Sequence, residues 1–284
     1  MAEDEHQALI DKLAAWGRLP DDQIPLAEAA LTLSALNRPG LSLDRYRVHL
    51  DKLVKEAGFA HRDIVASSAE DNAMSRIEAL REVLVGRNSY AGDSENYDDL
   101  QNADLISVID RRKGMPITLS ILYIHVAREQ GWQVYGLNFP GHFVIRVDHG
   151  SERLIADPFR ECRVLQANDL RQIIKRTLGP RAELSAQYYE PASNRAILIR
   201  LQNNIKIRQI EHEDYEEAIR TVEAMRALDP NEYRLLLDAG VLYARTRRLE
   251  AAIKTLESYI LQAPDDRDRH EAALLLQQIR QLLG

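Results

Sequence analysis

Apolar residues three and four positions apart recur over the first third of the chain. This spacing places apolar side chains on one face of a helix, so it predicts successive amphipathic helices. Between them, Pro20, Pro39-Gly40 and Gly58 mark expected loops, and the stretch 87–104, rich in Asn, Ser, Gly and Asp, favours a further loop. We therefore predict a helical region with a loop over residues 1–104. The clearest periodic segments are 24–36, 46–53 and 77–85.

The pattern changes in the middle of the chain. Residues 116–130 form a strong helix candidate, since proline suits the first helical turn and Gly131 is a natural stop. Three short runs rich in Val, Ile, Phe and Tyr follow, separated by Pro140-Gly141 and Gly150-Ser151, which is typical of an antiparallel meander. We predict an α+β core over 105–190, a helix plus a small antiparallel sheet. The expected strands are 133–139, 142–148 and 153–156.

The last third is helical again and contains an internal repeat. The segment 217–223 (EAIRTVE) lies 34 residues before 251–257 (AAIKTLE), and Pro230 and Pro264 keep the same phase. This period is that of the tetratricopeptide helix-turn-helix unit. The second copy carries Gly240 and Tyr243 where paired helices must approach closely, whereas the first has Lys206 at the small-residue position. We predict two repeats and a final helix over 268–283, within a domain 191–284 that follows a domain 1–190.

Composition narrows the functional classes. The 284 residues have a formal net charge of −7, which is unlike nucleic-acid-binding domains, and 45% hydrophobic residues fit a folded chain. The acidic first ten residues do not resemble a secretory signal, and no run reaches the roughly 20 apolar residues of a membrane span. The single cysteine, Cys162, allows no internal disulfide and no cysteine-based zinc site. We expect a cytoplasmic protein with no metal, cofactor, nucleic acid or membrane partner.

A histidine and an aspartate stand on neighbouring predicted strands. His142 and Asp157 are 15 residues apart, and pairing of the strands as a hairpin would let their side chains meet. A histidine oriented by a carboxylate is the acid–base half of a nucleophilic triad. The alternative is a buried polar pair that only hydrogen-bonds.

Three segments carry a family resemblance. They are 112–120 (RKGMPITLS), 138–143 (NFPGHF) and 157–159 (DPF). Together they resemble the bacterial transglutaminase-like family with a C-terminal tetratricopeptide tail that is named for the invasion-gene regulator SirB, first member. The resemblance implies a transglutaminase or papain-like core, in which His142 and Asp157 match the second and third triad members. The overall fold expected is α+β and predominantly helical.

The resemblance also implies where a nucleophilic cysteine should stand, about fifteen residues before Gly131. That position is Pro116, which has no nucleophile. The hydroxyls of Thr118 and Ser120 and the thiol of Cys162 are possible substitutes; each also has an ordinary structural interpretation.

Further residues are candidates to line a pocket around the His–Asp pair. They are Asn88, Asn138, Thr118 and Ser120. Asn88 could help to hold an oxyanion, or it could only stabilise a turn. The basic run 111–113 could shape the mouth of the pocket or form a solvated surface.

Two functions follow. The first is a non-catalytic protein-binding or regulatory protein, in which a core without its cysteine is joined to repeats that bind a protein or peptide. The second is a slow hydrolase or amide-modifying enzyme that uses His142 and Asp157 without a thiol.

Overall fold

The computed structural model describes residues 2–67 and 70–283. The chain divides into two units, Pro25–Leu198, called here the core unit, and Met1–Ile24 with Ile199–Gly284, called here the repeat unit. This division differs from the one predicted at 190/191, because the first helix groups with the repeats and the later boundary falls within helix α8 (Asn194–Glu211). Which segments fold independently stays a prediction.

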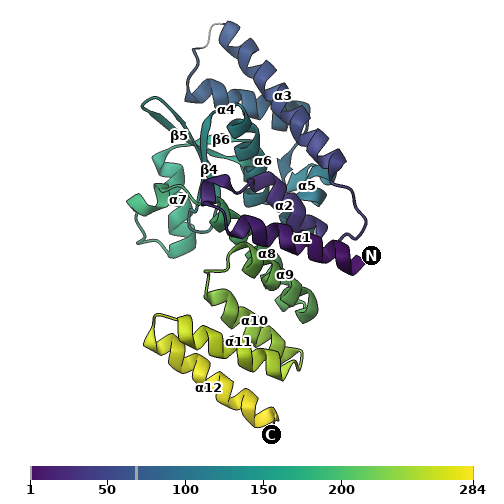
Figure 1. The fold of residues 1–284 in the computed structure, drawn as a ribbon. Coiled ribbons are helices and arrows are strands. Elements are labelled where there is room, and N and C mark those ends of the chain that lie inside the picture. The colour runs from purple at the N-terminus through teal and green to yellow at the C-terminus, as the bar shows by residue number, and fades with distance from the viewer. Residues whose placement is uncertain (1, 68–69, 284) are drawn as a thin grey trace. The chain divides into compact units, whose positions relative to one another are not determined.

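The core unit combines helices with one four-stranded sheet and a short two-stranded pairing (Figure 1). This confirms the predicted α+β, predominantly helical fold. Its elements are α2 (Leu26–Ala35), α3 (Asp44–Ala66), α4 (Ala73–Arg81), a π-helical turn (Glu82–Arg87), β1 (Ala91–Gly92), a 3₁₀ turn (Leu100–Ala103), α5 (Leu105–Arg111), β2 (Lys113–Gly114), α6 (Pro116–Glu129), β3 (Gln133–Leu137), β4 (Val144–His149), β5 (Glu152–Asp157), a 3₁₀ turn (Pro158–Arg160), β6 (Arg163–Leu165), α7 (Ala167–Leu178) and a 3₁₀ turn (Ala186–Tyr189).

Helix α6 is the centre of the core unit. Pro116 is its first residue, and Gly131 adopts a positive φ of 75° just after it, so both predicted end signals are used. Most of its side chains are buried, because it contacts α2, α3, α4 and α5 as well as strands β3 and β4. A helix that is apolar on nearly every side is typical of this central position.

The sheet is an antiparallel meander in the order β3-β4-β5-β6. Side chains alternate across it: Val144 joins an apolar cluster with Leu170 and Ile174 of α7, whereas Ile145 and Val147 face the side where α4 and α6 pack. The sheet therefore lies between α7 on one face and α4 and α6 on the other. The fourth strand, only three residues long, was not predicted from the sequence.

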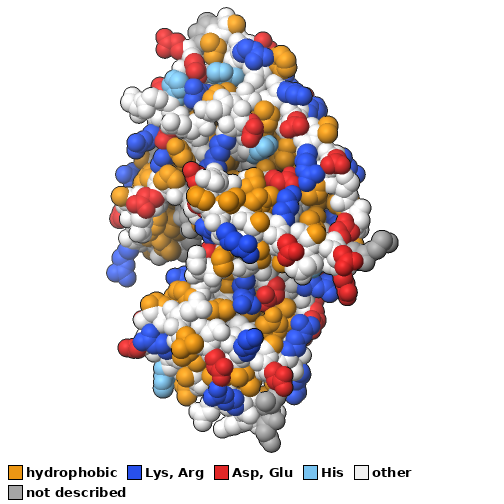
Figure 2. Space-filling model, in the orientation of Figure 1, with side chains coloured by type: hydrophobic (Ala, Val, Ile, Leu, Met, Phe, Trp, Pro, Cys, Tyr) orange, Lys and Arg blue, Asp and Glu red, His pale blue; other side chains and the backbone are white. Residues whose placement is uncertain are grey.

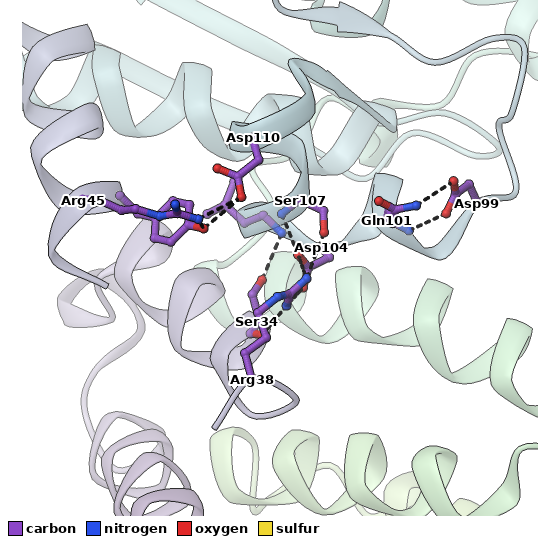
Figure 3. Close-up of polar contacts among 10 residues, drawn as sticks. Ser34, Arg38, Arg45, Asp99, Gln101, Asp104, Ser107 and Asp110 are labelled. Atoms are coloured by element: carbon purple, nitrogen blue, oxygen red, sulfur yellow. Dashed lines mark hydrogen bonds and ion pairs between the residues drawn. The ribbon is translucent and has the colours of Figure 1, made fainter. Parts of the chain in front are cut away.

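Hydrogen bonds from Arg38 connect the end of α2 to the start of α5 (Figure 3). Arg38 donates two hydrogen bonds of 2.9 Å to the carboxylate of Asp104, which also caps α5 by accepting from the backbone of Ser107. The same guanidinium donates to the backbone oxygen of Ser34 and to the hydroxyl of Ser107. Arg38 thus fixes the entry of the chain into α5 by charge-assisted bonds.

The loop predicted at Gly58 was wrong, because α3 continues through this residue from Asp44 to Ala66. A Cβ at Gly58 would lie 2.8 Å from Oε1 of Gln130, whose amide nitrogen donates to the backbone oxygen of Val54 at 2.7 Å. The glycine therefore permits a close approach of Gln130 to α3 and does not end the helix.

The repeat unit contains α1 (Ala2–Gly17), the later part of α8, α9 (Tyr215–Leu228), α10 (Arg234–Arg245), α11 (Leu249–Gln262) and α12 (Asp266–Leu283). Successive helices from α9 to α12 pack as antiparallel hairpins, and α1 packs on α9 (Figure 1). The first helix was not expected to join the repeats. Its glycine, Gly17, lies where a Cβ would meet the backbone oxygens of Ala227 and Leu228.

The two residues singled out for repeat packing occupy contact positions. A Cβ added at Gly240 would lie 2.7 Å from Leu256, so α10 and α11 approach closely there. The hydroxyl of Tyr243 donates to Glu223 at 2.7 Å. Lys206, which replaces a small residue, is 8% exposed and pairs with Asp238 at 2.5 Å, so an ion pair accommodates the departure from the repeat pattern.

Charges of both signs share the surface. On the face of the described chain in Figure 2, Lys and Arg side chains are interspersed with Asp and Glu side chains. None of the helices within residues 2–67 and 70–283 has the length and hydropathy that a membrane span requires.

Candidate functional site

His142 and Asp157 meet at one end of the sheet. His142 lies in the loop just before β4, outside the strand predicted for it, and Asp157 is the last residue of β5. Nε2 of His142 is 2.8 Å from Oδ2 of Asp157. Because an ionised carboxylate only accepts hydrogen bonds, Nε2 of His142 is the donor in this contact, and in a neutral imidazole Nδ1 is then the acceptor.

The carboxylate of Asp157 is held from a second side. Its other oxygen accepts a 3.0 Å bond from the backbone N–H of Phe159, in the 3₁₀ turn that follows β5. Asp157 is 1% exposed, whereas 16% of the His142 side chain is exposed. The two hydrogen bonds therefore hold the carboxylate of Asp157 in place, and the imidazole of His142 stays partly exposed to solvent.

A glycine sets the distance between the histidine loop and α7. Gly141 has a φ of 72°, and a Cβ there would lie 2.1 Å from Oγ1 of Thr177. Any side chain at residue 141 would be both strained and in collision with α7. The loop thus lies directly against α7, which becomes a wall of the site.

A cavity of about 180 Å³ opens beside the pair. Phe159 packs edge-on against both His142 and Tyr97, with ring centroids 6.3 Å and 5.7 Å away, so it borders the imidazole without sealing it. The lining residues are Gly141, His142, Asp157, Arg160, Ile173, Arg176 and Thr177.

The position expected for a nucleophile holds Pro116, the buried first residue of α6. The hydroxyl of Thr118 donates to the backbone oxygen of Asn102 at 2.8 Å, and that of Ser120 donates to the backbone oxygen of Pro116 at 2.7 Å. Both side chains are fully buried. Each hydroxyl hydrogen is therefore committed to a carbonyl. The bond of Ser120, to the residue four positions back, is the local pattern usual for Ser in helices, whereas the bond of Thr118 reaches Asn102 in the preceding 3₁₀ turn.

Cys162 is buried, with 1% of its surface exposed. Burial, together with the negative charge of Asp157, raises the pKa of its thiol far above the ordinary value, and the opposing effect of Arg81 is smaller. The reactive thiolate is thus disfavoured at neutral pH.

The remaining predicted pocket residues do not line the cavity. The side chain of Asn88 donates to Glu56 at 2.7 Å and to the backbone oxygen of Val83 at 2.9 Å, and accepts from Lys52. It thereby ties the end of the π-helical turn to α3. Asn138 is an exposed residue just after β3.

The basic run 111–113 does not line the cavity, so of the two alternatives given for it the one in which it shapes the mouth was wrong. Arg111 pairs at 2.9 Å with Asp93, an acid that is 1% exposed. Arg112 ends α5 in a left-handed conformation and stacks over the ring of Tyr90, 4.8 Å from its centroid. These cations neutralise and cover local groups of the core unit instead.

Sequence reasoning missed the cavity wall formed by Arg160, Arg176 and Thr177. Arg160 had a usable signal, since it follows Asp157 by three residues. The α7 residues had none, because only tertiary packing brings them to the histidine loop. Within residues 2–67 and 70–283, no three His, Cys, Asp or Glu side chains are grouped so that they could hold a metal ion.

Comparison with protein families gives two matches. The transglutaminase-like superfamily matches residues 44–203, more than half of the chain, and the tetratricopeptide repeat matches residues 205–277.

Individual relatives agree with these matches. A UPF0162 protein from Xylella fastidiosa (strain Temecula1) is 30% identical over 256 residues, which cover 87% of this chain and 88% of that protein. A UPF0162 protein from Vibrio cholerae is 27% identical, over 86% of this chain and 88% of its own length. Human F-box only protein 21 is 27% identical over 169 residues, 54% of this chain and 27% of that protein. No solved structure matches.

Proposed function

This chain belongs to the transglutaminase-like superfamily, and from that premise we propose that it is a non-catalytic protein-binding or regulatory protein. Its tetratricopeptide repeats indicate a role in protein interaction, which is what such repeats generally mediate. As part of the same proposal, we infer that the chain is of the SirB type and that it resides in the reducing cytoplasm. The three quoted segments support the first, and the single cysteine supports the second.

The observation that carries the proposal is that none of the candidate nucleophiles, the three near the start of α6 and Cys162, is an available thiolate or an activated hydroxyl. Covalent catalysis by a triad of this kind needs a thiolate or an activated hydroxyl within hydrogen-bond reach of a base such as Nδ1 of His142. Pro116 has no such group, and Thr118 and Ser120 donate to backbone carbonyls. Cys162 is a buried, protonated thiol, since its pKa is strongly raised. These facts favour binding without a covalent intermediate.

The repeat unit offers a surface for a partner. Ile207 and Ile210 on α8 are 51% and 38% exposed, and their spacing of three places them on one face of the helix. Exposed apolar pairs of this kind suit contact with an amphipathic or extended peptide. Leu261 on α11 is 87% exposed, and the other large apolar residues of this helix are not exposed, so it provides a matched control.

The test is capture of partners from the native lysate with four full-length baits, followed by mass spectrometry for identity and modification. The baits are the unchanged chain, His142→Ala, the double variant Ile207→Asp/Ile210→Asp, and Leu261→Asp. We expect one specific, unmodified partner that His142→Ala and Leu261→Asp retain and the double variant loses. A partner that the unchanged chain trims or deamidates, and His142→Ala leaves intact, would sink the proposal.

A second candidate function is a slow hydrolase or amide-modifying enzyme. The 2.8 Å pair of His142 and Asp157 beside an open cavity favours it, because such a pair can activate water. General-base catalysis alone contributes about 10²–10⁴-fold. Under this function His142→Ala abolishes turnover of an amide or ester while the fold persists.

A further inference from the structure

The cavity beside His142 carries an excess of positive charge. Arg160 and Arg176 contribute two guanidinium groups to its lining, and Asp157 contributes the one carboxylate. With a neutral His142 the lining residues therefore sum to one positive charge. This stands out in a chain whose net charge is −7.

Neither arginine of the cavity donates a hydrogen bond to a carboxylate in the part of the chain that the structure describes. Within the described ranges no carboxylate lies at ion-pair distance from Arg176, whose Nε donates to the backbone oxygen of Gln172 at 3.2 Å. Arg160 approaches Asp157 only to 3.8 Å, beyond hydrogen-bond distance, and 52% of its side chain is exposed. By contrast, both terminal nitrogens of Arg38 donate to the carboxylate of Asp104 at 2.9 Å.

The size of the cavity limits what can enter. About 180 Å³ is below the roughly 300–1,000 Å³ of sites for drug-sized ligands, so it fits one functional group and its adjoining carbon atoms. Thr177 adds a hydroxyl to the lining, and Ile173 adds an aliphatic wall. A group that is charged at its tip and aliphatic behind it matches this lining.

We propose that this cavity binds a carboxylate group of a partner protein, either a chain end or an acidic side chain. The planar fork of a guanidinium matches a carboxylate through two parallel hydrogen bonds, and two arginines line the cavity. A monoanion balances the single excess charge, whereas a phosphate dianion would bring more repulsion against Asp157. The inference rests on the proposed function in one respect: the cavity binds the group and does not convert it.

The test uses three N-acetylated tripeptides and the full-length protein. The probes are acetyl-Ala-Ala-Ala with a free carboxylate, the same peptide as its C-terminal amide, and acetyl-Ala-Glu-Ala amide; inorganic phosphate is a fourth. Binding is followed by the methyl NMR signals of Ile173 and Thr177. We expect a saturable shift with at least one carboxylate peptide, and at least tenfold weaker binding of the neutral amide and of phosphate. The carboxylate peptide that binds more tightly identifies the source of the group.

Three variants make the test specific. Arg160→Gln and Arg176→Gln should each weaken carboxylate binding at least tenfold. Arg171→Gln, on the same helix but outside the cavity lining, should leave it unchanged. Unperturbed methyl signals elsewhere verify that each variant is folded. Equal binding of acid and amide peptides, or no response to either cavity variant, would overturn the inference.

The two proposals fail in different ways. Mass spectrometry of the peptides after titration reports any conversion. A carboxylate peptide that binds and is converted would refute the non-catalytic function and leave the carboxylate site standing. A lysate partner that is retained unmodified, with no carboxylate peptide bound, would refute the carboxylate site alone.

Discussion

Replacing Gly141 with alanine tests the contact that builds the cavity wall. The residue has a φ of 72°, where a non-glycine residue costs roughly 1–2 kcal/mol. The new Cβ would also lie 2.1 Å from Oγ1 of Thr177, and overpacking of a folded site typically costs about 1–3 kcal/mol. We expect Gly141→Ala to reduce the free energy of unfolding of the core unit by about 2–5 kcal/mol.

A second glycine separates the two contributions. Gly150, in the turn between β4 and β5, has a φ of 57° and open space where a Cβ would lie. Gly150→Ala should therefore cost only the backbone part, roughly 1–2 kcal/mol. Adding Thr177→Ala to Gly141→Ala removes the two nearest clashing atoms, so it should restore most of the difference between the glycine variants.

The assay is urea unfolding followed by the fluorescence of Trp132, a core-unit residue that is 8% exposed. The other tryptophan, Trp16, lies on α1 of the repeat unit and is replaced by phenylalanine in every variant. Equal losses for Gly141→Ala and Gly150→Ala, or no rescue by Thr177→Ala, would refute the reasoning that α7 lies directly against the histidine loop.

Three further outcomes are expected. Arg38→Ala should lower the free energy of unfolding by about 2–3 kcal/mol in urea titrations, because Asp104 is 15% exposed and loses its charged partner, whereas Arg45→Ala, 63% exposed, should cost under about 1 kcal/mol. Cys162 should resist alkylation by maleimide at pH 8 until urea unfolds the chain, since burial raises the pKa of its thiol; rapid labelling of the native protein would contradict this. Burial and the charge of Arg112 lower the pKa of His49 to about 4 from an ordinary 6.5, so as the pH falls from 6.5 towards 4 the unfolded chain binds a proton that the folded chain does not. Stability should therefore decline across that window, and His49→Gln should flatten the decline.

The parts of the fold that could be predicted from the sequence depend on local signals. Pro116 and Gly131 mark the ends of α6 because helix ends follow short-range backbone chemistry. The contact of His142 with Asp157 could be anticipated because the turn at Gly150-Ser151 pairs the strands on either side of it as a hairpin. The 34-residue repeat likewise predicted helices α9 to α12.

The parts that could not be predicted depend on tertiary contacts. Gly58 looks like a helix stop in the sequence. In the structure its lack of a side chain leaves room for Gln130, which is remote in sequence, to pack against α3. Arg176 reaches the cavity only because α7 packs against Gly141, and no local pattern announces that contact. Arg111 and Arg112 look like a surface run in the sequence. In the structure Arg111 pairs with the buried Asp93, and Arg112 stacks over the ring of Tyr90.

We propose that this chain binds a protein partner without covalent chemistry. The most direct measurement is the mass of the captured partner after incubation with the full chain in ¹⁸O-labelled water, compared with His142→Ala. Hydrolysis or deamidation would place one heavy oxygen at each converted site. We expect a bound partner of unchanged mass with both proteins. A partner that gains heavy oxygen with the unchanged chain, and not with His142→Ala, would contradict it.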